Sequence, residues 1–205
     1  CLMTPEEHIR ALNEKPELLK SCGRPAIDTQ VEIRDENDNP LPIGEIGQIC
    51  AKGPQIMKGY WNKKEESEKA LKGGWMHTGD AGRMDEEGFV FIQDRIKDMI
   101  VSGGENIYST EVEAALFAHP DVVDAAVIGV PDEKYGEVVK ACIVKKEGSN
   151  VTEADLISFC KDRIASYKKP QSVDFIDEVP RNASGKVLKK VLREPYWKDQ
   201  ERQVS

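Results

Sequence analysis

The stretch DRIKDMIVSGGENIYSTEVE, residues 94–113, decides how this chain is divided. Its charged residues Asp94, Arg95, Lys97 and Asp98 come immediately before an apolar run at 99–101. A solvated link that leads directly into a core is typical of a domain boundary without a long linker. We therefore predict one folded part before this stretch and another after it.

The composition is that of an ordinary globular chain. Of its 205 residues 39% are hydrophobic and 32% are charged, which is enough apolar material for one large or two small domains. The net charge of −8 argues against general binding to nucleic acid or to anionic membranes, because both favour a basic face. No run approaches the roughly 18 apolar residues of a membrane span, and the start CLMTPEEH lacks the layout of a signal peptide. We interpret the chain as a cytoplasmic protein or a piece of one.

Cysteines and histidines give no sign of a disulfide framework or a zinc site. The five cysteines are odd in number and include no Cys-x-x-Cys pair. The three histidines, His8, His77 and His119, share no metal-ligand spacing. We therefore expect reduced thiols in the core and no metal site.

The first part has the pattern of antiparallel strands. Alternating polar and apolar residues between turn-forming stretches predict strands near 31–33, 45–50, 76–84 and 89–93. We expect these strands to form part of a small barrel or a twisted sheet. Asn62, with Glu65 three residues later, predicts a capped helix that continues through Lys72.

The second part alternates helices with strands. Thr110 and Glu113 predict a capping box at the start of one helix, and Thr152 predicts the N-cap of another. Apolar runs at 122–130 and 138–145 predict buried strands. The pattern indicates a compact α+β unit of about 100 residues, a usual domain size.

Two short stretches in the first part could hold a nucleotide. Asp80 follows Thr78 and Gly79 at a strand end, and its carboxylate is suited to accept hydrogen bonds from the vicinal hydroxyls of a ribose. A simple Gly-Asp turn is the alternative. Arg95 could reach a ribose or a phosphate with its forked donors while Asp94 holds it. A solvated charge cluster at a junction is the alternative for this pair.

Two stretches in the second part could also carry chemistry. Ser102-Gly103-Gly104 lets the backbone approach a ligand closely because glycine has no Cβ, although an ordinary turn has the same composition. In PRNASGKVL, residues 180–188, a flexible Asn-x-Ser-Gly loop places Lys186 ahead of a helix and could carry a mobile cation into a distant site. The Gly-Lys pair is not a phosphate-binding P-loop, because the spacing of that motif is absent.

Five motifs, taken in order, resemble those of the adenylate-forming acyl-CoA synthetase family. Its barrel motif is similar to GEIGQI at 44–49 with GPQIMKGYW at 53–61, and its ribose-binding motif to GWMHTGD at 74–80. Its hinge, penultimate and catalytic-lysine motifs are similar to residues 94–113, 165–170 (ASYKKP) and 180–188. The resemblance implies an α+β fold: an antiparallel β-barrel-like subdomain ending a large N-terminal domain, over 1–94, then a small mobile α+β C-terminal domain over 95–205.

The resemblance implies a role for each matched position. Asp80 would bind the ribose hydroxyls of ATP or AMP, with Arg95 assisting. Lys186 would contact the carboxylate and the α-phosphate during adenylation and stabilise charge there. The domain would then rotate about its hinge, and the tunnel for the CoA thiol would be lined by Ser102, Gly103 and Gly104.

The resemblance further implies an ATP-dependent carboxylic acid:CoA ligase of the fatty-acyl type, with ATP, Mg²⁺ and coenzyme A as cofactors and Lys97 as the hinge. The family's Gly-rich phosphate loop and Tyr-Gly-x-Thr-Glu motif are not among these residues. We therefore expect a C-terminal fragment, inactive without the missing N-terminal domain of the same protein. Because that domain builds most of the acyl pocket, an aryl or other carboxylic acid stays open as the substrate. An alternative of another class is a stand-alone module that binds CoA or a nucleotide.

Overall fold

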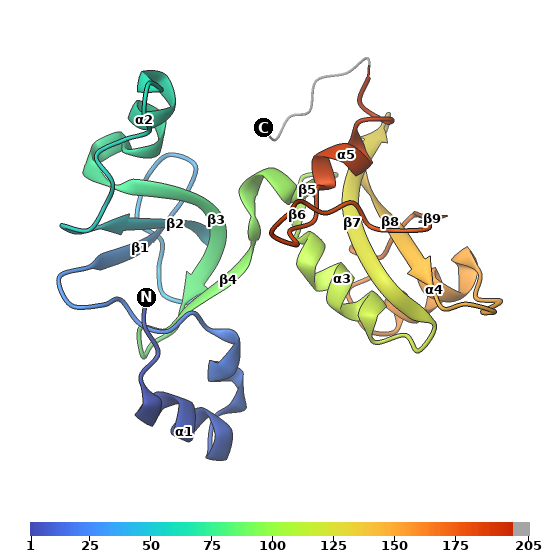
Figure 1. Cartoon of the computed structure of the whole chain (residues 1–205), viewed down its shortest axis with the longest axis horizontal. Helices are drawn as coiled ribbons and strands as arrows, with labels where there is room; N and C mark the ends of the chain where they lie inside the picture. The colour runs from blue at the N-terminus through green and yellow to red at the C-terminus, as the bar shows by residue number, and fades with distance from the viewer. Residues whose placement is uncertain (199–205) are drawn as a thin grey trace. The chain divides into compact units, whose positions relative to one another are not determined.

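The structure is a computed structural model that describes residues 1–198. The chain forms two compact units, Cys1–Ile96 and Lys97–Ser205 (Figure 1). Each unit mixes helices with strands, in agreement with the α+β class predicted from the sequence. Within the described residues, no helix combines the length and the apolar character that crossing a bilayer requires.

The first unit is built around a four-stranded antiparallel sheet. In spatial as well as chain order, its strands are β1 (Gln30–Arg34), β2 (Gly47–Lys52), β3 (Met76–Met84) and β4 (Val90–Arg95) (Figure 1). Over residues 1–96 the sheet is open, with β1 and β4 at its edges, so the barrel-like subdomain is not a closed barrel. Ile33, Ile49 and Val90 form one small core on this sheet. Phe89 and Phe91 belong to a second core, against the helical segments that precede β1.

The helical segments of the first unit are short. They are α1 (Pro5–Asn13), α2 (Lys64–Ala70) and the 3-10 turns η1 (Pro16–Lys20) and η2 (Lys72–Gly74); a further turn, η3 (Ile96–Asp98), spans the unit boundary. The predicted cap at Asn62 is wrong, because α2 begins at Lys64 and its N-cap, Lys63, makes no side-chain capping bond. Asn62 instead has a left-handed φ of 54°. Asparagine tolerates this conformation better than most residues, so it turns the chain before the helix.

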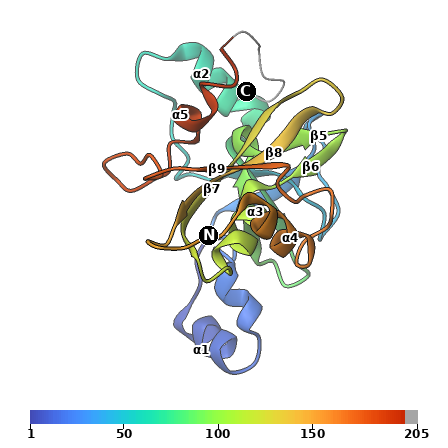
Figure 2. The same ribbon diagram turned by 90° about the vertical axis from the view of Figure 1, so that its right-hand side faces the viewer.

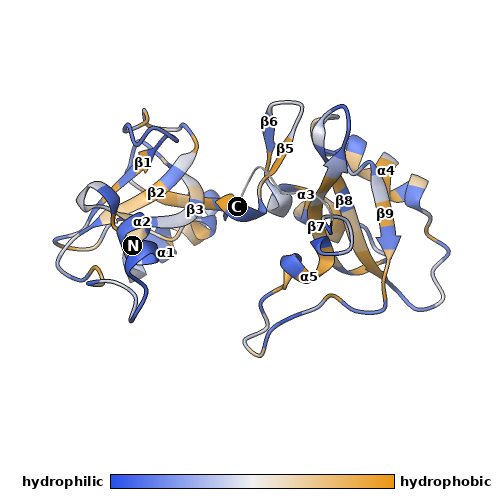
Figure 3. Cartoon of the chain, turned by 90° about the horizontal axis from the view of Figure 1, so that it is seen from above, coloured by the Kyte–Doolittle hydropathy of each residue, from blue (hydrophilic) through white to orange (hydrophobic). Residues whose placement is uncertain are grey.

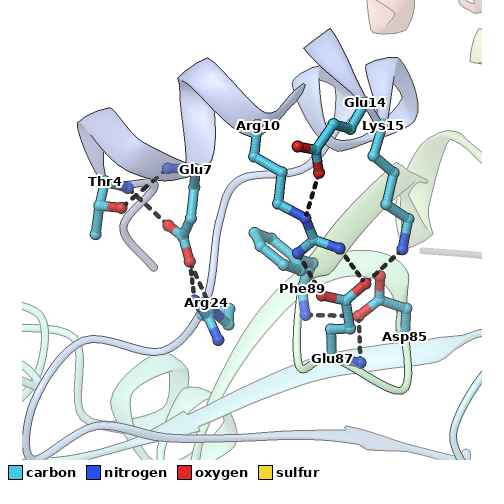
Figure 4. Close-up of polar contacts among 9 residues, drawn as sticks. All are labelled: Thr4, Glu7, Arg10, Glu14, Lys15, Arg24, Asp85, Glu87 and Phe89. Atoms are coloured by element: carbon cyan, nitrogen blue, oxygen red, sulfur yellow. Dashed lines mark hydrogen bonds and ion pairs between the residues drawn. The ribbon is translucent and has the colours of Figure 1, made fainter. Parts of the chain in front are cut away.

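Ion pairs join α1 and the residues just after it to the turn between β3 and β4 (Figure 4). Arg10 Nη1 lies 2.5 Å and Lys15 Nζ 2.6 Å from the carboxylate of Glu87, which is in that turn. Thr4 and Glu7 form a capping box at the start of α1. Arg10 and then Lys15 lower the pKa of Glu87 from 4.5 to about 2, because both cations favour the charged carboxylate. An ionised Glu87 therefore contributes to the attachment of α1, beside the apolar contacts of Ala11 with Phe89 and Phe91.

We expect the variant Glu87→Gln to lose part of the acid sensitivity of the chain. A carboxyl with a lowered folded pKa contributes stability above its unfolded pKa and loses it as the pH falls through the folded value. For Glu87 that window runs from 4.5 down to about 2. The midpoint of thermal unfolding should be lower than wild type at pH 7 and decline less between pH values of about 5 and 2.

The exposed neighbour Glu86 provides the matched control. Glu86→Gln should keep the wild-type pH profile of the unfolding midpoint. Superimposable profiles for Glu87→Gln and wild type would show that the ion pairs do not stabilise the unit.

The second unit packs helices against a larger sheet (Figure 2). Its sheet contains the hairpin of β7 (Val122–Asp132) and β8 (Gly136–Lys145), the short strands β5 (Ile100–Ser102) and β6 (Glu105–Ile107), and β9 (Ser172–Phe175). The order is β6-β5-β8-β7, and β9 pairs parallel to β8. The helices are α3 (Ser109–Phe117), α4 (Glu153–Lys161) and α5 (Lys189–Arg193).

Alternation along β7 and β8 sorts their side chains onto two faces. One face, which includes Val127, packs against buried residues of α3 and α4. The opposite face, which includes Ile128, packs against Leu192 of α5 and against Tyr196. Figure 3 shows hydrophobic colouring along both strands. The segment that follows Lys186 is therefore anchored in the core of the second unit.

The predicted helix caps of this unit have opposite outcomes. Thr152 is confirmed as the N-cap of α4, where it forms a capping box with Asp155. The capping box of Thr110 with Glu113 is wrong, because α3 begins at Ser109 and its N-cap makes no side-chain capping bond. Glu113 instead accepts a hydrogen bond from the Val127 amide at 2.8 Å and thereby joins α3 to β7.

Candidate functional site

Asp80 and Arg95 face each other across two paired strands. They are direct partners in the register of β3 with β4, and Arg95 Nε lies 3.7 Å from Asp80 Oδ1. The Thr78 hydroxyl accepts a hydrogen bond from the Asp80 amide at 3.1 Å and donates one to the Ile49 carbonyl at 2.8 Å. The Asp80 side chain is 35% exposed and that of Arg95 is 56% exposed. A carboxylate on a fixed backbone and a guanidinium are thus presented together to solvent.

The charged residues 94–98 differ from the expected solvated link. Asp94 is only 6% exposed and accepts a hydrogen bond from the backbone amide of Arg95 at 2.8 Å. The ion-pair partner of the Arg95 guanidinium is Asp80 rather than Asp94. Asp98 pairs at 3.0 Å with Arg193 of α5, and both side chains are largely buried. Two of the four charges therefore have structural roles that periodicity could not indicate.

Ser102, Gly103 and Gly104 lie at the end of the β5–β6 hairpin. The two glycines form its connecting turn with φ values of 59° and 87°, as a tight two-residue hairpin turn requires. The Gly103 amide donates a hydrogen bond to the Tyr135 carbonyl at 2.9 Å, and a Cβ at Gly103 would lie 3.2 Å from that tyrosine ring. A Cβ at Gly104 would meet nothing within 4 Å. Gly104 is therefore the open side of the turn.

Lys186 projects from a loop that hydrogen bonds hold closed. The Asn182 side chain accepts bonds from the amides of Ser184 and Lys186, at 3.0 and 2.9 Å. Arg181 donates to the Gly185 carbonyl at 2.9 Å. The loop expected to be flexible is thus a cross-linked turn. Lys186 itself is exposed, and no ion pair joins its side chain to the described part of the chain.

Lys97 begins the second unit. Its carbonyl accepts a hydrogen bond from Arg193 Nη1 at 3.1 Å, and Arg193 also pairs with Asp98. Asp80 and Arg95 lie in the first unit, whereas 102–104 and Lys186 lie in the second. Sequence reasoning missed Arg193 altogether. The Asn-x-Ser spacing at 182–184 is typical of side-chain-capped turns and could have indicated that Asn182 closes the lysine loop.

One group of side chains could hold a metal ion, and its chemistry does not suit magnesium. Within residues 1–198, the metal-capable side chains that lie together in a group of three or more are Asp38, Cys50 and His77. Magnesium requires oxygen ligands in octahedral geometry, whereas this group offers a thiol and an imidazole. This group is therefore not assigned to Mg²⁺.

Two family models match the chain. The model described as AMP-binding enzyme matches residues 3–61, in the first unit. The model described as AMP-binding enzyme C-terminal domain matches residues 111–186, in the second. The second match includes Lys186.

Curated relatives and a solved structure agree with these models. A fatty acid–acyl-carrier-protein ligase of Streptomyces coeruleorubidus is 43% identical over 188 residues, 92% of this chain and 36% of the relative. A feruloyl-CoA synthase of an Amycolatopsis species is 44% identical over 180 residues, 88% of this chain and 37% of the relative. The o-succinylbenzoate CoA synthetase of Bacillus subtilis, solved with its acyl-adenylate intermediate, has a TM-score of 0.81 at 36% identity, covering 96% of this chain and 38% of that one.

The chain spans little more than a third of the length of these relatives. Over that span, the similarity extends across both units and is far above the level at which only a fold would be shared. The chain belongs to the family of AMP-binding, adenylate-forming enzymes.

Proposed function

We propose that this chain is part of an ATP-dependent carboxylic acid:CoA ligase that forms an acyl adenylate and then a CoA thioester. One observation carries the proposal: the residues that match the AMP-binding enzyme C-terminal domain end at Lys186, which is exposed on a loop that hydrogen bonds hold closed. Exposed lysines are commonly unpaired, so the place of Lys186 on this loop, and not the lack of a partner, distinguishes it from the other exposed lysines. A lysine presented this way is available to a negatively charged reactant.

The first half-reaction would use Asp80, Arg95 and Lys186. The Asp80 carboxylate accepts hydrogen bonds from the ribose hydroxyls of ATP, and the neighbouring Arg95 assists. A carboxylate oxygen of the acid attacks the α-phosphorus, the bond to the bridging oxygen breaks, and pyrophosphate leaves. Lys186 lies against the acid and the α-phosphate and stabilises the charge that develops there.

The second half-reaction would use the glycine turn of the β5–β6 hairpin. The CoA thiolate attacks the acyl carbonyl of the adenylate, the carbon–sulfur bond forms, the carbon–oxygen bond to phosphate breaks, and AMP leaves. Gly103 and Gly104 let the pantetheine arm approach the backbone, and Ser102 lies beside them. We assign residues 1–94 to the large adenylation domain, 95–205 to a mobile C-terminal domain, and Lys97 to the hinge between them.

We propose a fatty acid as the substrate and the cytoplasm as the location. The ligase of Streptomyces coeruleorubidus acts on fatty acids by its name, and it matches 92% of this chain. An aryl acid is the second candidate, because the feruloyl-CoA synthase is just as similar, at 44% identity. Sequence identity over these residues does not distinguish a fatty acid from an aryl acid as the substrate, since the family's acyl pocket lies mainly outside them.

A panel of carboxylic acids tests the proposal on the intact protein. With ATP and CoA, we expect fatty acids to give CoA thioesters and equimolar AMP, detected by mass spectrometry. Thioesters from hydroxycinnamic acids alone would transfer the assignment to aryl acids. The 205-residue chain by itself should produce no thioester. Tight binding of CoA or ATP by that chain, together with an intact protein inactive on every acid, would favour the binding-module alternative.

A further inference from the structure

Three side chains with different metal-binding atoms meet in the first unit. Asp38 lies in the turn between β1 and β2, Cys50 is on β2, and His77 is on β3. One potential ligand atom from each lies within 4.8 Å of the other two. The Cys50 side chain is buried, and those of Asp38 and His77 are 18% and 13% exposed. The cluster is thus largely sheltered from solvent.

His77 is oriented as metal-binding histidines are. Its Nδ1 lies 2.7 Å from Gln48 Oε1 and 3.5 Å from Cys50 Sγ; in the tautomer in which Nδ1 donates to the Gln48 oxygen, Nε2 carries the lone pair. Ligating histidines commonly donate their other ring N–H to an oxygen, which fixes tautomer and orientation. Gln48 provides that oxygen here.

The Nε2 atom of His77 has no partner of its own. It is buried and makes no hydrogen bond within the described residues. The closest carboxylate oxygen, Asp38 Oδ1, is 3.6 Å away, which is beyond hydrogen-bond length. A buried nitrogen without a partner is costly, and a lone pair opposite a carboxylate oxygen favours a cation between them.

We propose that Asp38, Cys50 and His77 form a zinc site, which binds through one carboxylate oxygen, the sulfur and Nε2. Tetrahedral zinc with ligands at about 2.0–2.3 Å places those ligands roughly 3.3–3.8 Å apart. One potential ligand atom from each residue now lies within 4.8 Å of the other two, and Cys50 Sγ lies 3.5 Å from Nδ1, so binding through Nε2 requires Cys50 to rotate toward that nitrogen. As the sulfur–zinc bond forms, the S–H bond breaks and the proton passes to solvent. The fourth position is left to water.

Charges around the site are compatible with one added cation. Arg34 Nη1 lies 3.2 Å from Asp38 Oδ1 and is the competing cation. Arg34 is also held by Glu32 at 2.7 Å and stacks on the Trp75 ring at 4.4 Å. These contacts keep Arg34 in place when the Asp38 carboxylate turns toward a metal. Zinc fits better than magnesium or calcium because the donors include sulfur and nitrogen.

The spacing of these residues along the chain did not indicate the cluster, because Cys50 and His77 are 27 positions apart. The antiparallel register of β2 with β3 pairs the two directly and brings them together. A bound zinc would join the β1–β2 turn to β3, three residues before Asp80. The inference does not depend on the proposed ligase activity.

Metal titration of the 205-residue chain tests the site. After treatment with a chelator, the chain should bind one Zn²⁺ by calorimetry and raise its unfolding temperature. Co²⁺ in place of Zn²⁺ should produce a thiolate-to-cobalt charge-transfer band. Cys50→Ser should remove that band, and His77→Ala and Asp38→Asn should each weaken Zn²⁺ binding at least tenfold. Gln48→Leu, which removes only the acceptor for Nδ1, should weaken it about 10–100-fold.

Matched controls separate this site from general thiol binding. Cys160→Ser removes another buried thiol and His8→Gln another histidine, and both should leave the Zn²⁺ affinity unchanged. Circular dichroism checks that each variant folds; if Cys50→Ser does not, Asp38→Asn in the turn decides. Absence of Zn²⁺ binding, or affinity unaffected by Asp38→Asn and His77→Ala, would refute the site.

Discussion

Replacing Lys186 with alanine in the full-length protein is expected to slow acyl-adenylate formation by at least about 10²-fold, the usual effect of removing one donor that stabilises transition-state charge. The side chain is exposed, so its loss should not disturb the fold. Thioester formation from supplied acyl adenylate and CoA should proceed at the wild-type rate, because in the proposed mechanism the lysine acts only while the α-phosphorus is attacked. Acid-dependent exchange of pyrophosphate into ATP measures the first step, and CoA thioester release measures the second.

The matched control is Lys190→Ala, which removes another exposed lysine four residues further along the chain. Both half-reactions should be unaffected by that change. If Lys186→Ala slowed the two half-reactions equally, the lysine could not be specific to adenylation. Equal loss would indicate a general effect on the second unit.

Replacing Gly104 with phenylalanine should have the converse effect and slow thioester formation by at least about 10²-fold, equivalent to about 2.7 kcal/mol on the barrier. A side chain at this position has open space around it and would project from the turn where the proposal places the pantetheine arm. Adenylation should continue, so acyl adenylate should accumulate on the enzyme. Rapid-quench measurement of bound adenylate would detect it.

Gly148→Phe controls for backbone strain. Gly148 has a φ of 76°, and a Cβ there would meet nothing within 4 Å, which closely matches the φ of 87° and the open surroundings of Gly104. Both substitutions carry the same cost, about 1–2 kcal/mol for a left-handed residue with a side chain. CoA transfer that is unchanged in Gly104→Phe, or equally slowed in Gly148→Phe, would remove the turn from the thiol path.

The strands were predictable because their signal is local. Alternation and turn residues predicted the strands that became β1 to β4, and apolar runs predicted the strands that became β7 and β8. The helix starts at Asn62 and Thr110 were not predictable. A capping pattern shows which bonds a side chain can make, but it does not show which conformation the backbone of that residue adopts. Asn62 adopted a left-handed turn, and Glu113 bonded to β7 instead of its own helix.

The candidate site likewise depends on contacts that local sequence patterns cannot indicate. The motif around Asp80 indicated a presented carboxylate, and the structure adds that Arg95 lies opposite it in the strand register. Asp98 was expected in solvent, but its partner Arg193 is 95 residues away in the chain and no local pattern could indicate the pair. The meeting of Cys50 with His77 likewise required the pairing of β2 with β3. Contacts between distant segments had to come from the folded chain.

The two bonds of Arg193 have a mechanical consequence. Arg193 ends α5, which begins three residues after Lys186, and it binds both the Lys97 carbonyl and the Asp98 carboxylate. The same helix is packed into the core of its unit through Leu192. Helix α5 therefore holds the start of the second unit and the base of the lysine loop together. A change of backbone angle at Lys97 would displace Lys186 in proportion to its distance from Lys97, without any rearrangement of the loop itself.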